Sequence, residues 1–251
     1  MVKDYRKWFL GRVKKAISDF AMIRDGDRVA VGFSGGKDST SLLHALHLIR
    51  RSAPGVSFGL EAIFVDMGWP VDIPLLAAFC RAHEVDLSVV KTDIASIVFE
   101  HRRDQSPCAI CSHLRRGAFH DRALELGCSR VALGHHLDDV VETFFMSLFY
   151  TGQFRTFAPD TYLDRTGLHM IRPLIYLPAG EIKKWAGLEG LPAIPNPCPV
   201  SGKTKREEAK ELVAELRERC PNLGASFLNA LLTFDPSNLW PKREKIPPGG
   251  P

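Results

Sequence analysis

The stretch Arg28-Val-Ala-Val-Gly-Phe-Ser-Gly-Gly-Lys-Asp-Ser39 decides the fold of this chain. Residues 29–33 form a short apolar run rich in valine, as expected for a buried strand of a parallel sheet. The turn 34–36 follows directly, and apolar residues then recur at helical spacing over 42–49. A strand, a tight glycine turn and a helix start predict a phosphate site, because converging N–H groups and the helix dipole favour an anion.

The turn differs from the Walker P-loop at two positions. Val31 stands where that motif has its first glycine, and Asp38 follows Lys37 where a Mg²⁺-binding Ser or Thr is required. The hexapeptide S-G-G-K-D-S is instead similar to the PP-loop of the ATP pyrophosphatase superfamily. That resemblance implies that attack falls on the α-phosphorus of ATP and that pyrophosphate leaves. The residues that it implies for nucleotide binding are Ser34, Gly35, Gly36, Lys37, Asp38 and Ser39. Six matched residues in this context disfavour the alternative of an ordinary glycine-rich turn.

Length and composition predict a soluble globular protein. The chain has 251 residues, of which 45% are hydrophobic and 25% charged, enough for one sizeable core. No apolar run is long enough to span a bilayer, and the first residues lack the pattern of a signal peptide. We therefore expect a cytoplasmic protein without membrane contact. The net charge of +4 is mildly basic and does not by itself establish a nucleic-acid partner.

Segments with strand and helix patterns alternate along the chain. Strands are predicted at 29–33, 60–65, 85–90 and 131–134, with helices following at 71–83, from 94 and from 140. This alternation predicts an α/β fold, a doubly wound parallel sheet flanked by helices with small N- and C-terminal helical extensions. The expected divisions are an N-terminal helix in 1–25, a PP-loop ATP pyrophosphatase domain with a Cys-x-x-Cys insertion in 26–190, a C-terminal segment with a third cysteine and helices in 191–240, and a disordered tail in 241–251.

Two of the predicted strands end near acidic residues. Asp66 closes the second strand, where it is either a helix cap or an acceptor for the nucleotide. After the fourth strand, G-H-H-L-D-D at 134–139 resembles the GH(H/N)xDD element of PP-loop enzymes that modify tRNA. Gly134 permits a close approach at the strand end, and Asp138 and Asp139 suit Mg²⁺ beside phosphates. Capping of the helix by Asp138, with Asp139 favouring its dipole, is compatible with that role. The nucleotide contacts implied here are Gly134 and His135, and the magnesium ligands are Asp38, Asp138 and Asp139.

The cysteines suggest a metal site. Cys108 and Cys111 form a Cys-x-x-Cys pair just before a helix predicted to begin near His113, a position that lowers thiol pKa values and suits metal binding. Cys198 lies in a proline-rich loop. A closed zinc site would recruit Cys220 or a histidine, whereas three thiolates leave one corner of an iron–sulfur cluster open. A redox disulfide between Cys108 and Cys111 is the other possibility, but it leaves Cys198 without a role. Small buried hydrophobes are expected at Cys80 and Cys128.

Four segments together resemble the tRNA 2-thiocytidine synthetase (TtcA) family. They are C-A-I-C-S-H-L-R-R-G from Cys108, G-H-H-L-D-D-V-V-E-T-F-F from Gly134, I-R-P-L from Ile171, and the late Cys198. The match runs from about Arg28 to Arg206. The resemblance implies an ATP-dependent tRNA thiolase with a 4Fe–4S cluster on Cys108, Cys111 and Cys198. The catalytic residues that it implies are Lys37, Asp38, Arg115 and Asp138. The segment after Cys198 differs from that of better-known members, so the RNA target stays open.

The implied reaction adenylates the 2-carbonyl of a pyrimidine, expected to be a cytidine in the anticodon loop, and replaces its oxygen with sulfur held at the cluster. The expected cofactors are ATP, Mg²⁺ and the 4Fe–4S cluster. The expected partners are tRNA and a sulfur donor, either a cysteine desulfurase or free sulfide, and a homodimer is allowed. Basic residues on both sides of the cysteines predict a funnel for an RNA backbone, and they are Arg102, Arg103, Arg115, Arg116, Lys203, Lys205 and Arg206.

Two alternatives remain open. One is another PP-loop tRNA-modifying ligase or amidotransferase whose metal is a structural zinc. The other is a non-catalytic nucleotide- or RNA-binding module on the same fold. The iron content of the protein distinguishes a zinc-containing ligase from a thiolase. The release of pyrophosphate distinguishes an enzyme from a non-catalytic binding module.

Overall fold

The computed structural model describes residues 2–52, 56–101, 107–200, 202 and 205–240. Its centre is a six-stranded sheet with the order β3-β2-β1-β4-β6-β5. All neighbouring strands are parallel except the last pair, which is antiparallel. The strands are β1 (Arg28–Gly32), β2 (Gly59–Asp66), β3 (Asp86–Lys91), β4 (Arg130–Ala132), β5 (Asp160–Leu163) and β6 (Leu168–Ile171). The predicted α/β class with a doubly wound, mainly parallel sheet is confirmed.

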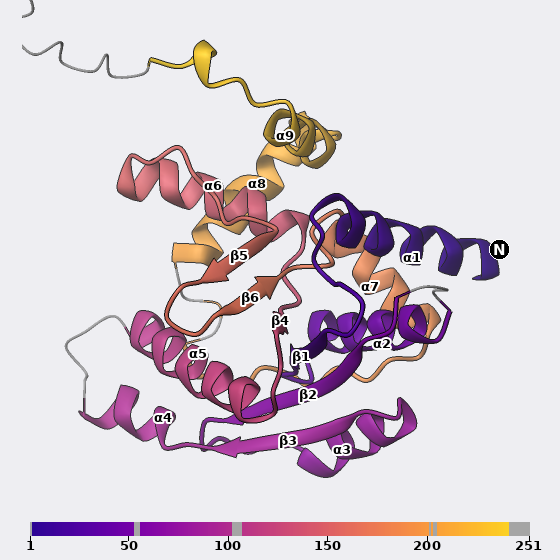
Figure 1. Ribbon diagram of the computed structural model, residues 1–251. Coiled ribbons are helices and arrows are strands. Elements are labelled where there is room, and N and C mark those ends of the chain that lie inside the picture. The colour runs from indigo at the N-terminus through magenta and orange to yellow at the C-terminus, as the bar shows by residue number, and fades with distance from the viewer. Residues whose placement is uncertain (1, 53–55, 102–106, 201, 203–204, 241–251) are drawn as a thin grey trace, which may run out of the picture.

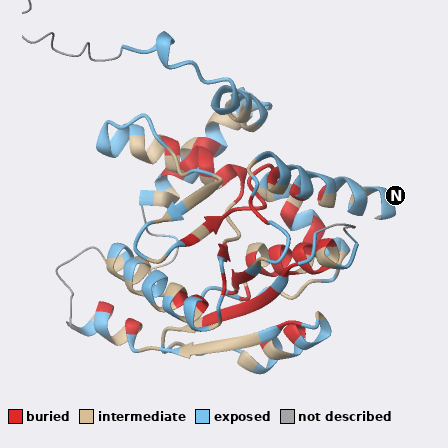
Figure 2. Cartoon of the chain, in the orientation of Figure 1, coloured by how far each residue is buried: buried red, intermediate tan, exposed pale blue. Residues whose placement is uncertain are grey.

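Helices cover both faces of the sheet (Figure 1). On one face lie α1 (Val2–Asp19), α2 (Lys37–Ser52), α3 (Ile73–Ala82) and α7 (Ala179–Leu188), which share the larger apolar core. On the other face lies α5 (Pro107–Glu125), which buries Phe119 and Ala123 against the sheet. Figure 2 shows that the buried residues are concentrated along the central strands and on the helices beside them.

Three further helices lie toward the end of the sheet that carries β5. They are α6 (Leu137–Thr151), α8 (Lys205–Arg219) and α9 (Leu223–Leu232), with a short 3₁₀ turn at Pro236–Asn238 after them. A short helix α4 (Ile94–Ser96), continued by a π-helical turn over Ile97–His101, follows β3. No helix in the described part of the chain combines the length and the apolar character needed to cross a membrane.

Three local predictions differ from the structure, and one hairpin was not predicted. The helix predicted near His113 already begins at Pro107, a residue whose fixed φ suits the first helical position, so the Cys-x-x-Cys pair lies inside its first two turns. The helix predicted from residue 94 is only three residues long before it widens into a π turn. The fourth strand stops at Ala132, two residues early. The hairpin of β5 and β6 was missed, although Gly167, with a φ of +71°, marks its turn.

The central strand sets the position of the site. β1 lies between β2 and β4. After β1 the chain adds β2 and β3 toward one edge of the sheet, and it then returns to add β4, β5 and β6 toward the other edge. The helices α2 and α6 begin at the carboxyl ends of the adjacent strands β1 and β4. A crevice forms where the crossovers diverge, and this is where ligands bind in doubly wound sheets. The predicted tail 241–251 lies outside the described residues.

The aromatic pair Phe9–Trp185 anchors α1 on this core. The two rings stack with centroids 4.2 Å apart, and both residues are fully buried. We expect Phe9→Ala to lower the free energy of unfolding by about 3–5 kcal/mol, because it leaves a cavity beneath α1. Trp8→Ala, at a neighbouring residue that is 40% exposed, is the matched control. Urea denaturation measures both, and equal losses would contradict this account of α1.

Candidate active site

The turn after β1 has a fixed shape. The Ser39 hydroxyl accepts the backbone N–H of Ser34 at 3.2 Å and donates to the carbonyl of Gly36 at 3.0 Å, which ties the turn to the first turn of α2. Gly35 has a φ of +76°, and a Cβ there would lie 2.6 Å from the Leu76 side chain. Only glycine fits this position, so the turn keeps the backbone geometry expected of an anion site.

The end of β4 lies directly against this turn. A Cβ on Gly134 would stand 3.0 Å from the backbone carbon of Asp38 and 3.1 Å from the amide nitrogen of Ser39. The close approach predicted at this glycine is therefore confirmed. It brings the residues after β4 next to the first residues of α2, from which the phosphate site is built.

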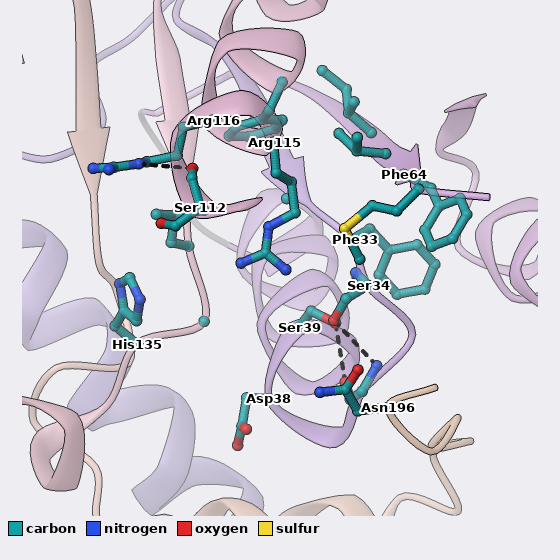
Figure 3. A pocket seen from close by; sticks show the side chains of 18 of the residues that line it. Phe33, Ser34, Asp38, Ser39, Phe64, Ser112, Arg115, Arg116, His135 and Asn196 are labelled. Atoms are coloured by element: carbon teal, nitrogen blue, oxygen red, sulfur yellow. Dashed lines mark hydrogen bonds between the residues drawn. The ribbon is translucent and has the colours of Figure 1, made fainter. Parts of the chain in front are cut away.

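A cavity of about 600 Å³ opens above the two strand ends. Seven of the predicted site residues line it, namely Ser34, Gly36, Asp38, Ser39, Arg115, Gly134 and His135. One wall is apolar and includes Phe33, Phe64 and Met67. Figure 3 shows the Arg115 side chain reaching from α5 into the space between His135 and the turn that carries Ser34. The cavity therefore joins an anion-binding turn, an apolar wall and a cation.

Three other residues predicted to bind the nucleotide do not line this cavity. Gly35 is packed against Leu76 and Ile194, and the Lys37 ammonium pairs with the Asp38 carboxylate at 2.6 Å. The Asp66 carboxylate accepts the backbone N–H of Gly68 at 2.9 Å and shapes the turn after β2. The interpretation of Asp66 as a helix cap is wrong, because Asp72 caps α3 by accepting the N–H of Leu75.

Asp138 and Asp139 lie behind the cavity wall, where arginines of α8 neutralise them. Asp138 is buried, pairs with Arg217 and accepts the N–H of Ala179 at 2.8 Å. Burial by itself would raise the pKa of this carboxyl, but the hydrogen bonds from Arg217 and Ala179 hold it below its ordinary value. Asp139 accepts the N–H of His136 at 2.9 Å and pairs with Arg206 at 3.1 Å. The predicted cap is therefore wrong: His136 is the N-cap of α6, and Asp139, three residues later, accepts its backbone N–H, whereas Asp138 accepts the N–H of Ala179.

The three predicted cluster ligands lie near one another, because Cys108 and Cys198 both act electrostatically on Cys111, and none of them lines the cavity itself. Cys108 is exposed, whereas Cys111 and Cys198 are half-buried, and all three thiols are free. Burial raises the pKa of Cys111, Arg115 opposes this effect, and Cys198 and Cys108 raise the pKa further. The predicted lowering of the pKa is therefore wrong at Cys111, where burial is the largest effect.

The predicted cluster ligands adjoin residues of the cavity wall. Among the described residues, no three His, Cys, Asp or Glu side chains converge closely enough to hold one metal ion. The neighbouring Ser112 and Pro197 both line the cavity, so a larger group held by the thiols would face it. Cys80 and Cys128 are buried, as predicted, and Cys220 is exposed just after α8.

The structure describes only some of the basic residues of the predicted RNA funnel. Arg115, Arg116 and Arg206 line the cavity, and Lys205 is exposed and paired with Glu208 at 2.8 Å. The other members, Arg102, Arg103 and Lys203, lie outside the described residues.

Sequence reasoning gave no role in the site to Arg172. It is only 6% exposed and lines the cavity. The available signal was its place in I-R-P-L, directly after an apolar strand. Asn196, which also lines the cavity, was not singled out either. Its loop is held on the phosphate turn by the N–H of Ile194, which donates to the carbonyl of Gly35 at 2.8 Å.

Comparisons with known proteins agree with this geometry. The chain matches the family model of the PP-loop domain over residues 9–208. It is 41% identical over 229 residues to the tRNA-cytidine(32) 2-sulfurtransferase of Syntrophotalea carbinolica, covering 90% of this chain and 88% of that one. The corresponding protein of Geobacter metallireducens is 40% identical over 241 residues, covering 94% and 93%. The solved U34-tRNA thiolase NcsA from Methanococcus maripaludis, with its 4Fe–4S cluster, shares the fold with a TM-score of 0.75, 23% identity, and coverage of 92% and 78%.

Glu142 is a buried carboxyl beside the acidic pair. It is 5% exposed, and its Oε2 has no hydrogen-bond partner among the described residues. Burial, with a contribution from Asp139, raises its pKa to about 7. Because the folded state binds this proton more tightly than the unfolded chain, the stabilisation is complete below the ordinary pKa of 4.5 and is lost as pH rises through about 7.

We therefore expect Glu142→Gln to stabilise the fold above pH 7 relative to the unmodified chain, by about 2–3 kcal/mol, and much less at about pH 5. Thermal unfolding of both proteins at the two pH values measures the difference. Glu211→Gln, at an exposed glutamate of α8, is the control and should show no such pH dependence. An equal effect of Glu142→Gln at both pH values would contradict the assignment.

Proposed function

The chain belongs to the tRNA-cytidine 2-sulfurtransferases of the PP-loop family, and on this premise we propose that it thiolates the 2-position of a cytidine in the anticodon loop of tRNA. It is an ATP-dependent sulfurtransferase. The observation that supports the finer proposal is one cavity lined by the predicted anion-binding turn, by Arg115, and by Ser112 and Pro197, which are the sequence neighbours of Cys111 and Cys198.

The reaction has two bond exchanges. The 2-carbonyl oxygen of the base attacks the α-phosphorus of ATP, and pyrophosphate leaves. Sulfide then adds to C2, and AMP leaves with the former carbonyl oxygen. The first exchange brings the base to the α-phosphate, and the second brings sulfide to the same C2, so the two exchanges together need one site that reaches ATP, the base and the sulfur source. The base must be unstacked to enter the cavity, which favours a target in a single-stranded loop.

The cavity has suitable places for the parts of ATP. The turn leads into the N-terminus of α2 at Lys37, and a helix N-terminus suits the terminal phosphates. The apolar wall with Phe33 and Phe64 suits the adenine ring. Of the three predicted magnesium ligands, Asp38 lines the cavity, whereas Asp138 and Asp139 do not. A magnesium role for Asp138 and Asp139 stays a prediction, and it requires these carboxylates to loosen their pairs with Arg217 and Arg206.

Cys108, Cys111 and Cys198 would hold the 4Fe–4S cluster. When bound through three thiolates, such a cluster leaves one iron with an open position for sulfide. Arg115 reaches into the space between His135 and the turn that carries Ser34 (Figure 3), and its charge favours both the Cys111 thiolate and the anionic groups of the reaction. The sulfur donor, a cysteine desulfurase or free sulfide, the cytoplasmic location and a homodimer stay predictions.

Thiolation is tested directly by incubating the anaerobically purified protein with tRNA, ATP, Mg²⁺ and sulfide. We expect 2-thiocytidine in the digested tRNA by mass spectrometry, with one AMP and one pyrophosphate released for each thiolated base. Pyrophosphate release without thiolated nucleoside, in protein containing zinc and no iron, would favour the ligase alternative. Absence of pyrophosphate with every tRNA tested would favour the binding module.

The nucleotide placement predicts a strong effect at Asp38. We expect Asp38→Asn to reduce pyrophosphate release by about 10²–10³ at saturating ATP, because it removes a charge at the phosphate site. Its iron content should stay unchanged. Asp66→Asn is the matched control, since an asparagine can still accept the N–H of Gly68 and its side chain does not line the cavity. Wild-type turnover in Asp38→Asn would show that the nucleotide binds elsewhere.

The cluster assignment predicts two classes of cysteine. Single Cys→Ser changes at 108, 111 and 198 should each abolish anaerobic iron binding and the visible absorption of the cluster. The same change at Cys80, Cys128 or Cys220 should leave both intact, because the first two are buried in the core and the third lies after α8. Iron loss in Cys220→Ser would indicate a closed four-cysteine site and would contradict an open iron position.

A further inference from the structure

Arg172 is a buried cation in the wall of the cavity. Its side chain donates to the carbonyl oxygen of Ala158, to the Thr161 hydroxyl at 3.2 Å and to the Met170 sulfur at 3.1 Å. Its guanidinium also lies over the Phe157 ring, 4.7 Å from the centroid. Burial lowers the pKa of Arg172 to about 10, so it stays charged at neutral pH. Since these contacts hold the guanidinium on several sides, its remaining Nε–H has a fixed direction.

That remaining donor is directed at His135. The Arg172 Nε lies 3.3 Å from the Nδ1 of His135. A guanidinium N–H can only donate, so Nδ1 must accept and carries no proton. A neutral imidazole with a bare Nδ1 has its proton on Nε2. Arg172 therefore selects one of the two tautomers, as a hydrogen-bond partner on one ring nitrogen does for metal-ligating histidines.

The surroundings also keep the imidazole neutral. Burial is the largest effect and lowers the pKa of His135 to about 4, with Asp139 opposing it and Arg172, Arg206 and His136 adding to it. The ring is packed 5.1 Å from that of Phe157, on which Arg172 also lies. Within the described part of the chain, the Nε2 of His135 has no hydrogen-bond partner, although the residue lines the cavity.

We propose that Arg172 is a positioning residue, which holds His135 as a neutral Nε2–H donor for a non-bridging oxygen of the α-phosphate of bound ATP. This role rests on the proposed function and deepens it. Charge grows on the α-phosphoryl oxygens as the base attacks, and a preorganised donor stabilises that charge. The carbonyl oxygen has no proton to lose in this step, so no general base is needed. His135 takes up no proton in the reaction, because Nδ1, the ring nitrogen that could accept one, already accepts the hydrogen bond from Arg172.

The tautomer is measured without substrate, by ¹⁵N NMR of the histidine-labelled protein at neutral pH, with the His135 signal assigned from His135→Gln. We expect an unprotonated Nδ1 and a protonated Nε2. Arg172→Met should release the ring and give mixed tautomers. Thr161→Val removes one partner of Arg172 but leaves the bond to His135, and it should keep the wild-type signal. A cationic ring, or a proton on Nδ1 in the wild type, would overturn the proposal.

Two substitutions of His135 test the donor even if Arg172→Met does not fold. A glutamine amide nitrogen reaches the position of Nε2, whereas an asparagine amide reaches only that of Nδ1. We expect His135→Gln to keep pyrophosphate release within about tenfold of wild type, and His135→Asn to lose about 10²-fold or more. Equal rates in the two variants would overturn the donor role. If wild-type protein forms the predicted tautomer but thiolates no tRNA, the proposed function fails while the tautomer assignment is supported.

Discussion

The contact between Gly134 and the backbone of Asp38 is the constraint on which the site depends. β1 and β4 are adjacent parallel strands, and the chain after each of them must turn into a helix at the same edge of the sheet. With a Cβ at residue 134 the two turns would stand apart, since that atom would lie 3.0 Å from the Asp38 backbone. Because the glycine allows contact, the phosphate turn and His135 share the wall of one cavity.

A second constraint comes from the C-terminal part of the chain. Arg206 and Arg217 of α8 pair with Asp139 and Asp138 at the start of α6. Buried carboxylates are costly without such partners, so α8 and the start of α6 stabilise each other. The C-terminal segment is therefore an integral part of the site. It also supplies Cys198 and the loop that lies on the phosphate turn. Any movement of α8 would change the charge balance at both aspartates together.

Local signals accounted for most of the fold and for seven of the residues that line the cavity. The strand, glycine turn and helix at 28–39 form as predicted, because apolar periodicity and the conformational freedom of glycine act over a few residues. The Cys-x-x-Cys pair was found, but its helix starts earlier than predicted, since Pro107 begins the helix before the pair. The β5–β6 hairpin was missed because its short strands carry only a weak alternating pattern.

The amino-acid sequence by itself determined which chemical groups are present and which short segments form strands, turns and helices, since those depend on neighbouring residues. Only the tertiary structure decided how these groups are paired. Arg217 is 79 positions from Asp138, and Arg172 is 37 positions from His135, so no local pattern links either pair. The charge of an aspartate and the tautomer of a histidine depend on burial and on the donor that packing places beside them. Both are properties of the folded chain, because the unfolded chain leaves each group in water.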